Sequence, residues 1–240
     1  MKETWRGYNG GVDGSQEHWI QVGSDGHKVH AWYLKADQPK APVLLYLHGA
    51  RWNLTGSVTR IERWRKLGFD VLAIDYRGFG KSSDVIPSES LAYEDAEAAW
   101  DYLAKLSPGT PRFIVGHSLG GAIAVELARR RPDTSGLVLE ATFTSVKDMI
   151  ANTAWSFLPV DLILTQNFDT LKKIPEVKAP VLVVHGTRDA IVPFEMGEKL
   201  YAAATAKKKR FIKVEGGSHH NLSYVAFEQY REALKELFAF

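Results

Sequence analysis

Five short apolar runs, separated by longer amphipathic stretches, constrain the fold of this chain more than any other feature. Each run is apolar at consecutive positions, which is typical of a strand buried on both faces of a parallel sheet. The runs are VLLYLHG (43–49), VLAIDY (71–76), FIVGHS (113–118), GLVLEAT (136–142) and VLVVHG (181–186). Apolar residues recur at helical spacing in the stretches between them, which are 54–67, 89–106, 119–130 and 194–206.

An antiparallel hairpin is expected before this alternation begins. Residues 18–36 alternate between apolar and polar side chains on both sides of a turn at Ser24, Asp25 and Gly26. The chain closes with an amphipathic stretch over 221–240, which predicts a final helix. The whole pattern predicts an α/β fold, in which a mostly parallel central sheet has an antiparallel N-terminal hairpin and helices on both faces.

The length of 240 residues suits a single domain over 1–240. Two segments fall outside the alternation. We expect 1–17 to be an irregular N-terminal segment, and 143–174, which is rich in bulky apolar residues, to be a small helical cap. The basic run 207–210 lies between a helical stretch and the strand-like sequence FIKVEG, and we interpret it as a solvated helix end.

Composition excludes several classes of protein. The absence of cysteine excludes disulfides, thiol catalysis and thiolate metal sites. The chain has 30 Lys and Arg against 28 Asp and Glu, and this balance argues against a nucleic-acid partner. It has neither an apolar run of transmembrane length nor the apolar core of a signal peptide. We therefore expect a cytoplasmic protein, although a processed or truncated exported form would have the same sequence, and the oligomeric state stays open.

The sequence Gly116–His117–Ser118–Leu119–Gly120 has the pattern G-x-S-x-G. It follows an apolar run and opens a helical stretch, which is the strand-turn-helix context in which this pattern holds a nucleophilic serine. The glycines leave room for neighbouring backbone, so that the serine can lie on a very tight turn. We therefore predict that Ser118 is a catalytic nucleophile.

A serine hydroxyl needs a base to take its proton, and the base needs an acid to orient it. Asp189 follows the 181–186 run, and His219 and His220 both follow the last strand-like run. Glu140 lies at the end of another run and is a fallback for the acid. Because the carboxyl ends of parallel strands meet at one edge of a sheet, we expect Asp189 and one of the two histidines to lie near Ser118.

These segments resemble the α/β-hydrolase superfamily, in particular the small bacterial serine esterases and lipase-like hydrolases, from about His18 onward. The motifs that carry the resemblance are His48–Gly49, DYRGFGKS (75–82), the G-x-S-x-G pattern at Ser118, HGTRD (185–189) with Val192–Pro193, and EGGSH (215–219). The resemblance implies an α/β-hydrolase fold, a Ser-His-Asp triad, an acyl-enzyme intermediate, and neither cofactor nor metal. Its E-G-x-x-H register selects His219 as the base, and its HGTRD turn selects Asp189 as the acid.

The resemblance also implies an oxyanion hole made by the backbone N–H groups of Ala50 and Leu119. Related sequences often have asparagine and then small residues after H-G, whereas here the large residues Arg51 and Trp52 follow Ala50. Arg51 and Trp52 are candidates for gating the site or binding an acyl or carboxylate group, and a surface role is equally open. Trp155 and Phe157 in the cap, together with Leu158 and Phe168, either form an apolar wall over the serine or attach the cap to the sheet.

We therefore expect a serine hydrolase that cleaves small-molecule carboxylic esters with small to medium acyl groups. A peptidase or amidase, or a thioesterase, would use the same residues. A non-catalytic binding protein with a degenerate hydrolase fold is a further alternative, but such proteins typically lack a member of the triad, and Ser118, Asp189 and His219 are all present.

Overall fold

The computed structural model describes residues 12–51, 53–152 and 166–238 of the chain. These residues form two compact units. Unit 1 contains 12–112, apart from Trp52, together with Gln166, and unit 2 contains 113–152 and 167–238.

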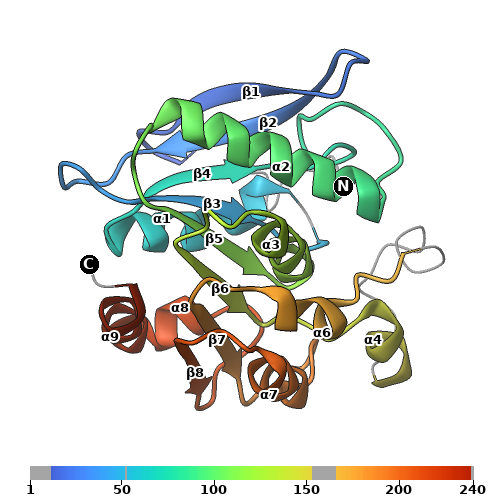
Figure 1. Cartoon of the computed structure of the whole chain (residues 1–240), viewed down its shortest axis with the longest axis vertical. Coiled ribbons are helices and arrows are strands. Elements are labelled where there is room, and N and C mark those ends of the chain that lie inside the picture. Colours follow the sequence, from blue (N-terminus) through green and yellow to red (C-terminus); the bar gives the residue numbers. More distant parts are fainter. Residues whose placement is uncertain (1–11, 52, 153–165, 239–240) are drawn as a thin grey trace. The chain divides into compact units, whose positions relative to one another are not determined.

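Unit 1 is built on four strands in the order β1-β2-β4-β3 (Figure 1). They are β1 (Gln16–Val22), β2 (His27–Leu34), β3 (Val43–Leu47) and β4 (Asp70–Ile74). β2 pairs antiparallel with both β1 and β4, whereas β3 and β4 are parallel, so the expected N-terminal hairpin is confirmed. β1 begins at Gln16, inside the segment 1–17 that we expected to be irregular, because Gln16 and Glu17 continue the pairing with β2.

The helices of unit 1 follow the apolar pattern of the sequence. The 3₁₀-helix η2 (Leu54–Ser57) leads into α1 (Val58–Lys66), which packs on β4, and α2 (Glu89–Leu106) packs on β1 and β3. The buried face of α2 holds the apolar stripe that predicted it, with Ala96, Ala99, Trp100 and Leu103 fully buried. Within the described ranges, no helix is both long enough and apolar enough to span a membrane.

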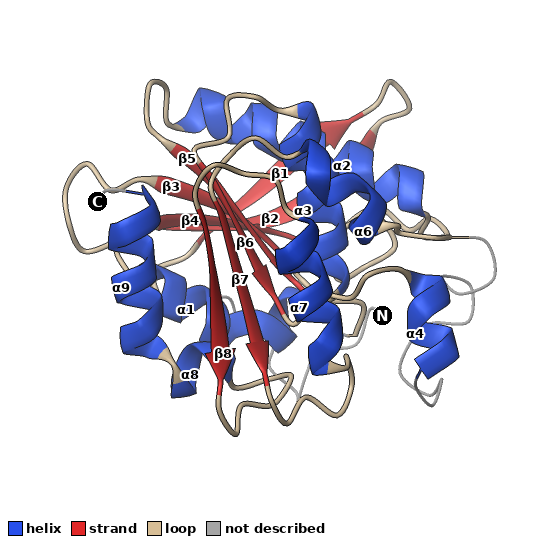
Figure 2. Cartoon of the chain, turned by 60° about the horizontal axis from the view of Figure 1, so that its bottom comes forward, coloured by secondary structure: helices blue, strands red, loops and turns tan. Residues whose placement is uncertain are grey.

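Unit 2 is built on four parallel strands in the order β5-β6-β7-β8. The strands are β5 (Arg112–His117), β6 (Gly136–Glu140), β7 (Val181–Gly186) and β8 (Lys209–Val214). The main helices between and after them are α3 (Leu119–Arg130), α4 (Val146–Asn152), α6 (Thr170–Lys173), α7 (Phe194–Ala203) and α9 (Phe227–Phe238). Figure 2 shows α7 and α9 on opposite sides of β7 and β8, so helices cover both faces of this sheet as expected.

Two segments of unit 2, the closing helix and the basic run 207–210, differ from the sequence expectation. The expected closing helix is divided into α8 (Leu222–Val225) and α9 at Ala226, whose backbone angles of φ −109° and ψ 24° depart from the α-helix. The basic run 207–210 is not a helix end, because Lys209 and Arg210 open β8. Lys209 nevertheless caps the C-terminal end of α7, since its Nζ donates to the carbonyl oxygens of Tyr201 and Ala204 at 2.9 and 2.8 Å.

The expected cap, 143–174, is described only at its two ends. They contain α4, α6 and the start of the 3₁₀-helix η3 (Ile174–Glu176). The remainder of the cap lies outside the described residues, and Trp155 and Phe157 lie in that remainder. The single-domain organisation and the cap therefore stay predictions.

Candidate active site

Ser118 occupies the tight turn between β5 and α3. Its backbone angles are φ 55° and ψ −119°, a conformation that side chains with a Cβ atom rarely adopt. Such strain persists only where the surroundings hold it, and it is concentrated at functional sites. The surroundings here include the carbonyl oxygen of Glu140 at the end of β6, which accepts the Ser118 N–H at 2.9 Å.

The glycines around Ser118 have a steric cause in unit 2. A Cβ atom at Gly116 would lie 2.3 Å from the carbonyl oxygen of Gly120, and one at Gly121 would lie 1.9 Å from Oγ1 of Thr142. The end of β5 approaches the first turn of α3 at Gly116, and α3 approaches Thr142 at Gly121, so closely that only glycine fits at either position. The G-x-S-x-G pattern predicts the need for glycine at position 116. It does not predict the need for glycine at position 121, which comes from Thr142, a residue outside the pattern.

Asp189 and His219 meet in the structure. Asp189 lies in the turn after β7 and His219 in the loop after β8. Nδ1 of His219 is 2.8 Å from Oδ2 of Asp189, and the two side chains are 6% and 0% exposed. Because the carboxylate accepts, Nδ1 carries the hydrogen and Nε2 is left to accept a proton. His220, the alternative candidate for the base, is exposed. Glu140, the alternative candidate for the acid, accepts a hydrogen bond from the hydroxyl of Tyr230 at 2.8 Å.

The carboxylate of Asp189 is held from several sides. Its Oδ1 accepts the backbone N–H groups of Ile191 and Val192 at 2.8 and 2.9 Å. Burial alone would raise the pKa of Asp189, but hydrogen bonds from His185 and His219, together with that from Val192, outweigh it and hold the pKa well below its usual value. Asp189 is therefore ionised at neutral pH.

His117 links the turn at Ser118 to the loop that carries His219. Its Nε2 lies 2.9 Å from the carbonyl oxygen of His219, so Nε2 donates the hydrogen bond. The centroids of the two imidazole rings are 4.7 Å apart. No sequence pattern indicated this hydrogen bond, because its two residues are 102 positions apart and only the folded sheet brings them together.

The predicted site residues of unit 1 lie in the loop after β3. Ala50 is buried and Arg51 is exposed, whereas Trp52 lies outside the described residues. The side chain of Asn53 accepts the backbone N–H of Thr55 at 3.0 Å and starts η2. The hydroxyl of Tyr76 donates to the carbonyl oxygen of His48 at 3.0 Å.

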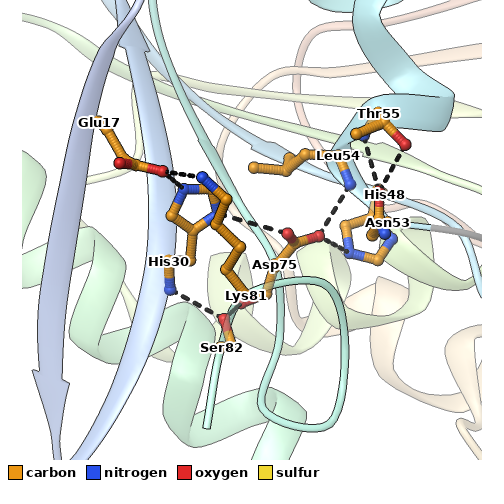
Figure 3. Close-up of polar contacts among 9 residues, drawn as sticks. All are labelled: Glu17, His30, His48, Asn53, Leu54, Thr55, Asp75, Lys81 and Ser82. Carbon is orange, nitrogen blue, oxygen red and sulfur yellow. Dashed lines mark hydrogen bonds and ion pairs between the residues drawn. The ribbon is translucent and has the colours of Figure 1, made fainter. Parts of the chain in front are cut away.

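Asp75 anchors this loop from the end of β4, and Figure 3 shows its carboxylate between the rings of His48 and His30. Oδ1 accepts the backbone N–H of Leu54 at 2.8 Å and lies 3.3 Å from Nε2 of His48, while Oδ2 lies 3.5 Å from Nδ1 of His30. Burial alone would raise the pKa of Asp75, but the contacts with His30 and His48 outweigh it and lower the pKa. A Cβ atom at Gly80 would lie 1.9 Å from Oδ2, which explains that glycine of the DYRGFGKS motif.

This cluster extends from the buried Asp75 to the surface of unit 1. Nε2 of His30 lies 2.8 Å from Oε1 of Glu17, and Nζ of Lys81 lies 2.5 Å from the same oxygen (Figure 3). The hydroxyl of Ser82 donates to the carbonyl oxygen of Asp75 and accepts the backbone N–H of His30. The motif at 75–82 thus connects the hairpin to the loop after β3.

Comparison with protein families identifies one matching family model. The model described as serine aminopeptidase, S33, matches 37–163 and 160–223, which is most of the chain. The chain is 32% identical over 224 residues to the α/β hydrolase domain-containing protein WAV2 of Arabidopsis thaliana, covering 85% of this chain and 72% of WAV2. It is 36% identical over 200 residues to an uncharacterized protein of Mycobacterium tuberculosis, covering 82% of this chain and 70% of that protein.

A further relative is the lysophosphatidylserine lipase ABHD12 of Danio rerio, 32% identical over 196 residues. The alignment covers 74% of this chain but only 51% of the lipase, so the chain spans about half the length of that relative. Among solved structures, the esterase Pf2001 of Pyrococcus furiosus has a TM-score of 0.75 at 20% identity, with 93% of each chain covered. Est1E of Butyrivibrio proteoclasticus, solved with ferulic acid bound, also has a TM-score of 0.75, at 19% identity over 93% of this chain and 100% of Est1E. At these identities both structures establish the fold alone.

Proposed function

Because the chain belongs to the serine aminopeptidase S33 family of the α/β-hydrolase superfamily, we propose that it is a serine hydrolase that cleaves carboxylic esters of small to medium acyl groups. In this proposal Ser118 is the nucleophile, His219 the general base and acid, and Asp189 the residue that orients His219. The observation that carries the proposal is the 2.8 Å contact between Nδ1 of His219 and Oδ2 of Asp189, in the unit that also holds the strained Ser118.

The proposed reaction begins with transfer of the Ser118 hydroxyl proton to Nε2 of His219 as Oγ attacks the ester carbonyl carbon. Asp189 keeps the proton on Nδ1 and stabilises the imidazolium that forms. The carbon–oxygen bond to the alcohol then breaks, and His219 returns the proton to the leaving alkoxide. A water molecule, deprotonated by His219, releases the acid from the acyl-enzyme and restores Ser118.

The backbone N–H groups of Leu119 and Ala50 are the proposed donors to the oxyanion of the tetrahedral intermediate. Leu119 is the first residue of α3, where helical N–H groups have no partner within the helix. Ala50 belongs to unit 1, and its role rests on the H-G-x motif. Arg51, Trp52, Trp155 and Phe157 remain proposed contacts to the substrate, and the cytoplasm remains the proposed location.

The test is a set of p-nitrophenyl esters of increasing acyl length, assayed with the wild-type protein and with Ser118→Ala. We expect hydrolysis to be fastest for short and medium chains and to fall at least 1,000-fold in kcat for Ser118→Ala, which keeps the Cβ atom but has no nucleophile. Equal rates for the two proteins would overturn the proposal.

Two observations favour other substrates for the same proposed triad. Each adds further substrates to the assay. The family description names an aminopeptidase, so aminoacyl p-nitroanilides form an amide arm. One relative is a lysophosphatidylserine lipase, so a lysophospholipid and a thioester form two more arms. Faster hydrolysis of an amide, thioester or lysophospholipid than of any short ester, lost in Ser118→Ala, would keep the triad and replace the proposed substrate.

A further inference from the structure

His185 is a buried histidine that the proposed reaction does not use. It lies near the end of β7, four positions before Asp189, and its side chain is 0% exposed. Its Nε2 lies 3.0 Å from the carbonyl oxygen of Val192 and 3.4 Å from Oδ2 of Asp189. The carbonyl only accepts hydrogen bonds, so Nε2 carries a hydrogen and directs it toward both oxygens.

The other ring nitrogen of His185 is enclosed without a partner. Nδ1 is buried and makes no hydrogen bond to any residue that the structure describes. Gly197 of α7 lies against it, since a Cβ atom there would come within 2.4 Å of Nδ1. The ring of Phe194 contacts His185 edge-on, with centroids 5.9 Å apart. A hydrogen on Nδ1 would have no acceptor, so the geometry fits the tautomer with its hydrogen on Nε2.

The contacts of His185 close the turn that carries Asp189. Oδ1 of Asp189 is occupied by the N–H groups of Ile191 and Val192, so Oδ2 is the oxygen that faces His219. His185 lies on the buried strand β7 and contacts both ends of this turn. Its Nε2 faces Oδ2 of Asp189 at one end and the carbonyl oxygen of Val192 at the other. Displacement of Oδ2 would weaken its hydrogen bond to His219, and the imidazole would lose its orientation.

We propose that His185 is a positioning residue of the triad, whose Nε2–H holds Oδ2 of Asp189 toward His219. The effect of His185 on kcat rests on the proposed function. Its effect on the position of Asp189 does not. A role in packing alone requires only that the buried volume be filled. A role in positioning requires a hydrogen-bond donor at the place of Nε2.

The variants His185→Gln and His185→Leu separate these two roles. The amide nitrogen of glutamine reaches approximately the place of Nε2 and donates, whereas leucine fills volume without donating. We expect His185→Leu to lower kcat by roughly 10- to 100-fold with little change in KM, as the loss of one hydrogen bond to a charged group predicts. His185→Gln should stay within about threefold of the wild type, and His27→Leu, at the partly exposed start of β2, is the control for a histidine-to-leucine change.

Proton NMR tests the positioning without reference to activity. The hydrogen between Nδ1 of His219 and Asp189 should give a strongly downfield resonance, identified by its absence in His219→Gln. We expect this resonance in the wild type and in His185→Gln, and expect it to shift upfield or vanish in His185→Leu. If His185→Leu does not fold, His185→Asn replaces it, because its shorter amide donates from the wrong place.

Three outcomes would overturn the inference. They are an unchanged resonance in folded His185→Leu, an unchanged kcat in that variant, and an equal loss of kcat in His185→Gln and His185→Leu. If the wild type hydrolyses none of the substrates, the proposed function fails, while the resonance still decides whether His185 positions Asp189.

Discussion

At the scale of single residues, Ser118 has a strained backbone conformation whose effect on stability can be measured. A residue with a Cβ atom at φ 55° and ψ −119° is destabilised by about 1–3 kcal/mol relative to an unstrained one. Glycine adopts this conformation freely. We therefore expect Ser118→Gly to raise the free energy of unfolding by about 1 kcal/mol, measured by urea denaturation. Ser118→Ala keeps the Cβ atom and should match the wild type, and a Ser118→Gly variant that is less stable than Ser118→Ala would contradict this explanation.

The residues of the site differ in how far the sequence could predict them. Ser118 was predicted from the G-x-S-x-G pattern after a strand-like run, whereas the resemblance to the α/β-hydrolase superfamily selected Asp189 and His219. The structure places the last two in contact. The partners of His117 and Asp75 could not be predicted in the same way. They lie 102 positions from His117 and up to 45 positions from Asp75, and only the folded topology brings such segments together.

At the scale of elements, a buried ion pair joins α2 to the turn after β4 in unit 1. Nε of Arg77 lies 2.5 Å from Oδ1 of Asp95, and the side chains are 5% and 0% exposed. Removing one partner leaves the other charge buried, so Arg77→Leu should lower the free energy of unfolding by about 3–5 kcal/mol. The double variant Arg77→Leu/Asp95→Leu should lose less than the sum of the two single changes.

The control for this prediction is a second ion pair of unit 1, between Arg65 and Asp37. Its side chains are 33% and 85% exposed, so Asp37→Ala should lower the free energy of unfolding by no more than about 1 kcal/mol. Urea denaturation of all four variants gives the comparison. A loss below 1 kcal/mol for Arg77→Leu would show that the buried pair does not hold α2 in place.

Most elements were predictable because the period of the apolar residues changes where a strand gives way to a helix. The stretches 89–106 and 119–130 match α2 and α3, and the 181–186 run matches β7. The basic run 207–210 was misassigned because its charge suggested solvent, whereas Lys209 reaches the carbonyl groups at the end of α7. The division of the closing helix at Ala226 was missed because the amphipathic period continues through it.

At the scale of the whole molecule, each unit contains a buried aspartate whose pKa is lowered, Asp75 in unit 1 and Asp189 in unit 2. Burial would raise each pKa, and the contacts with His30 and His48, and with His185 and His219, reverse that effect. Each carboxylate therefore binds a proton more weakly in the folded chain than in the unfolded chain. The stability that they contribute is present above about pH 4, the pKa of unfolded aspartate, and is lost as the pH falls toward their folded pKa values.

The measurement is the free energy of unfolding between about pH 2 and pH 6. We expect it to decrease below about pH 4, and expect the decrease to be shallower in Asp75→Asn, which has no carboxyl group to protonate. If the free energy of unfolding depends on pH equally in Asp75→Asn and in the wild type, Asp75 does not contribute to the loss of stability at low pH.

The proposed function depends on the activation of Ser118 by His219, which reaction with a fluorophosphonate can detect. The reagent phosphonylates only a serine whose proton is removed by a neighbouring base. We expect about one label per chain, located on Ser118 by peptide mass mapping. Labelling should be much slower in His219→Gln and nearly unchanged in His220→Gln. Absence of label on Ser118, or labelling that His219→Gln leaves unchanged, would contradict that activation.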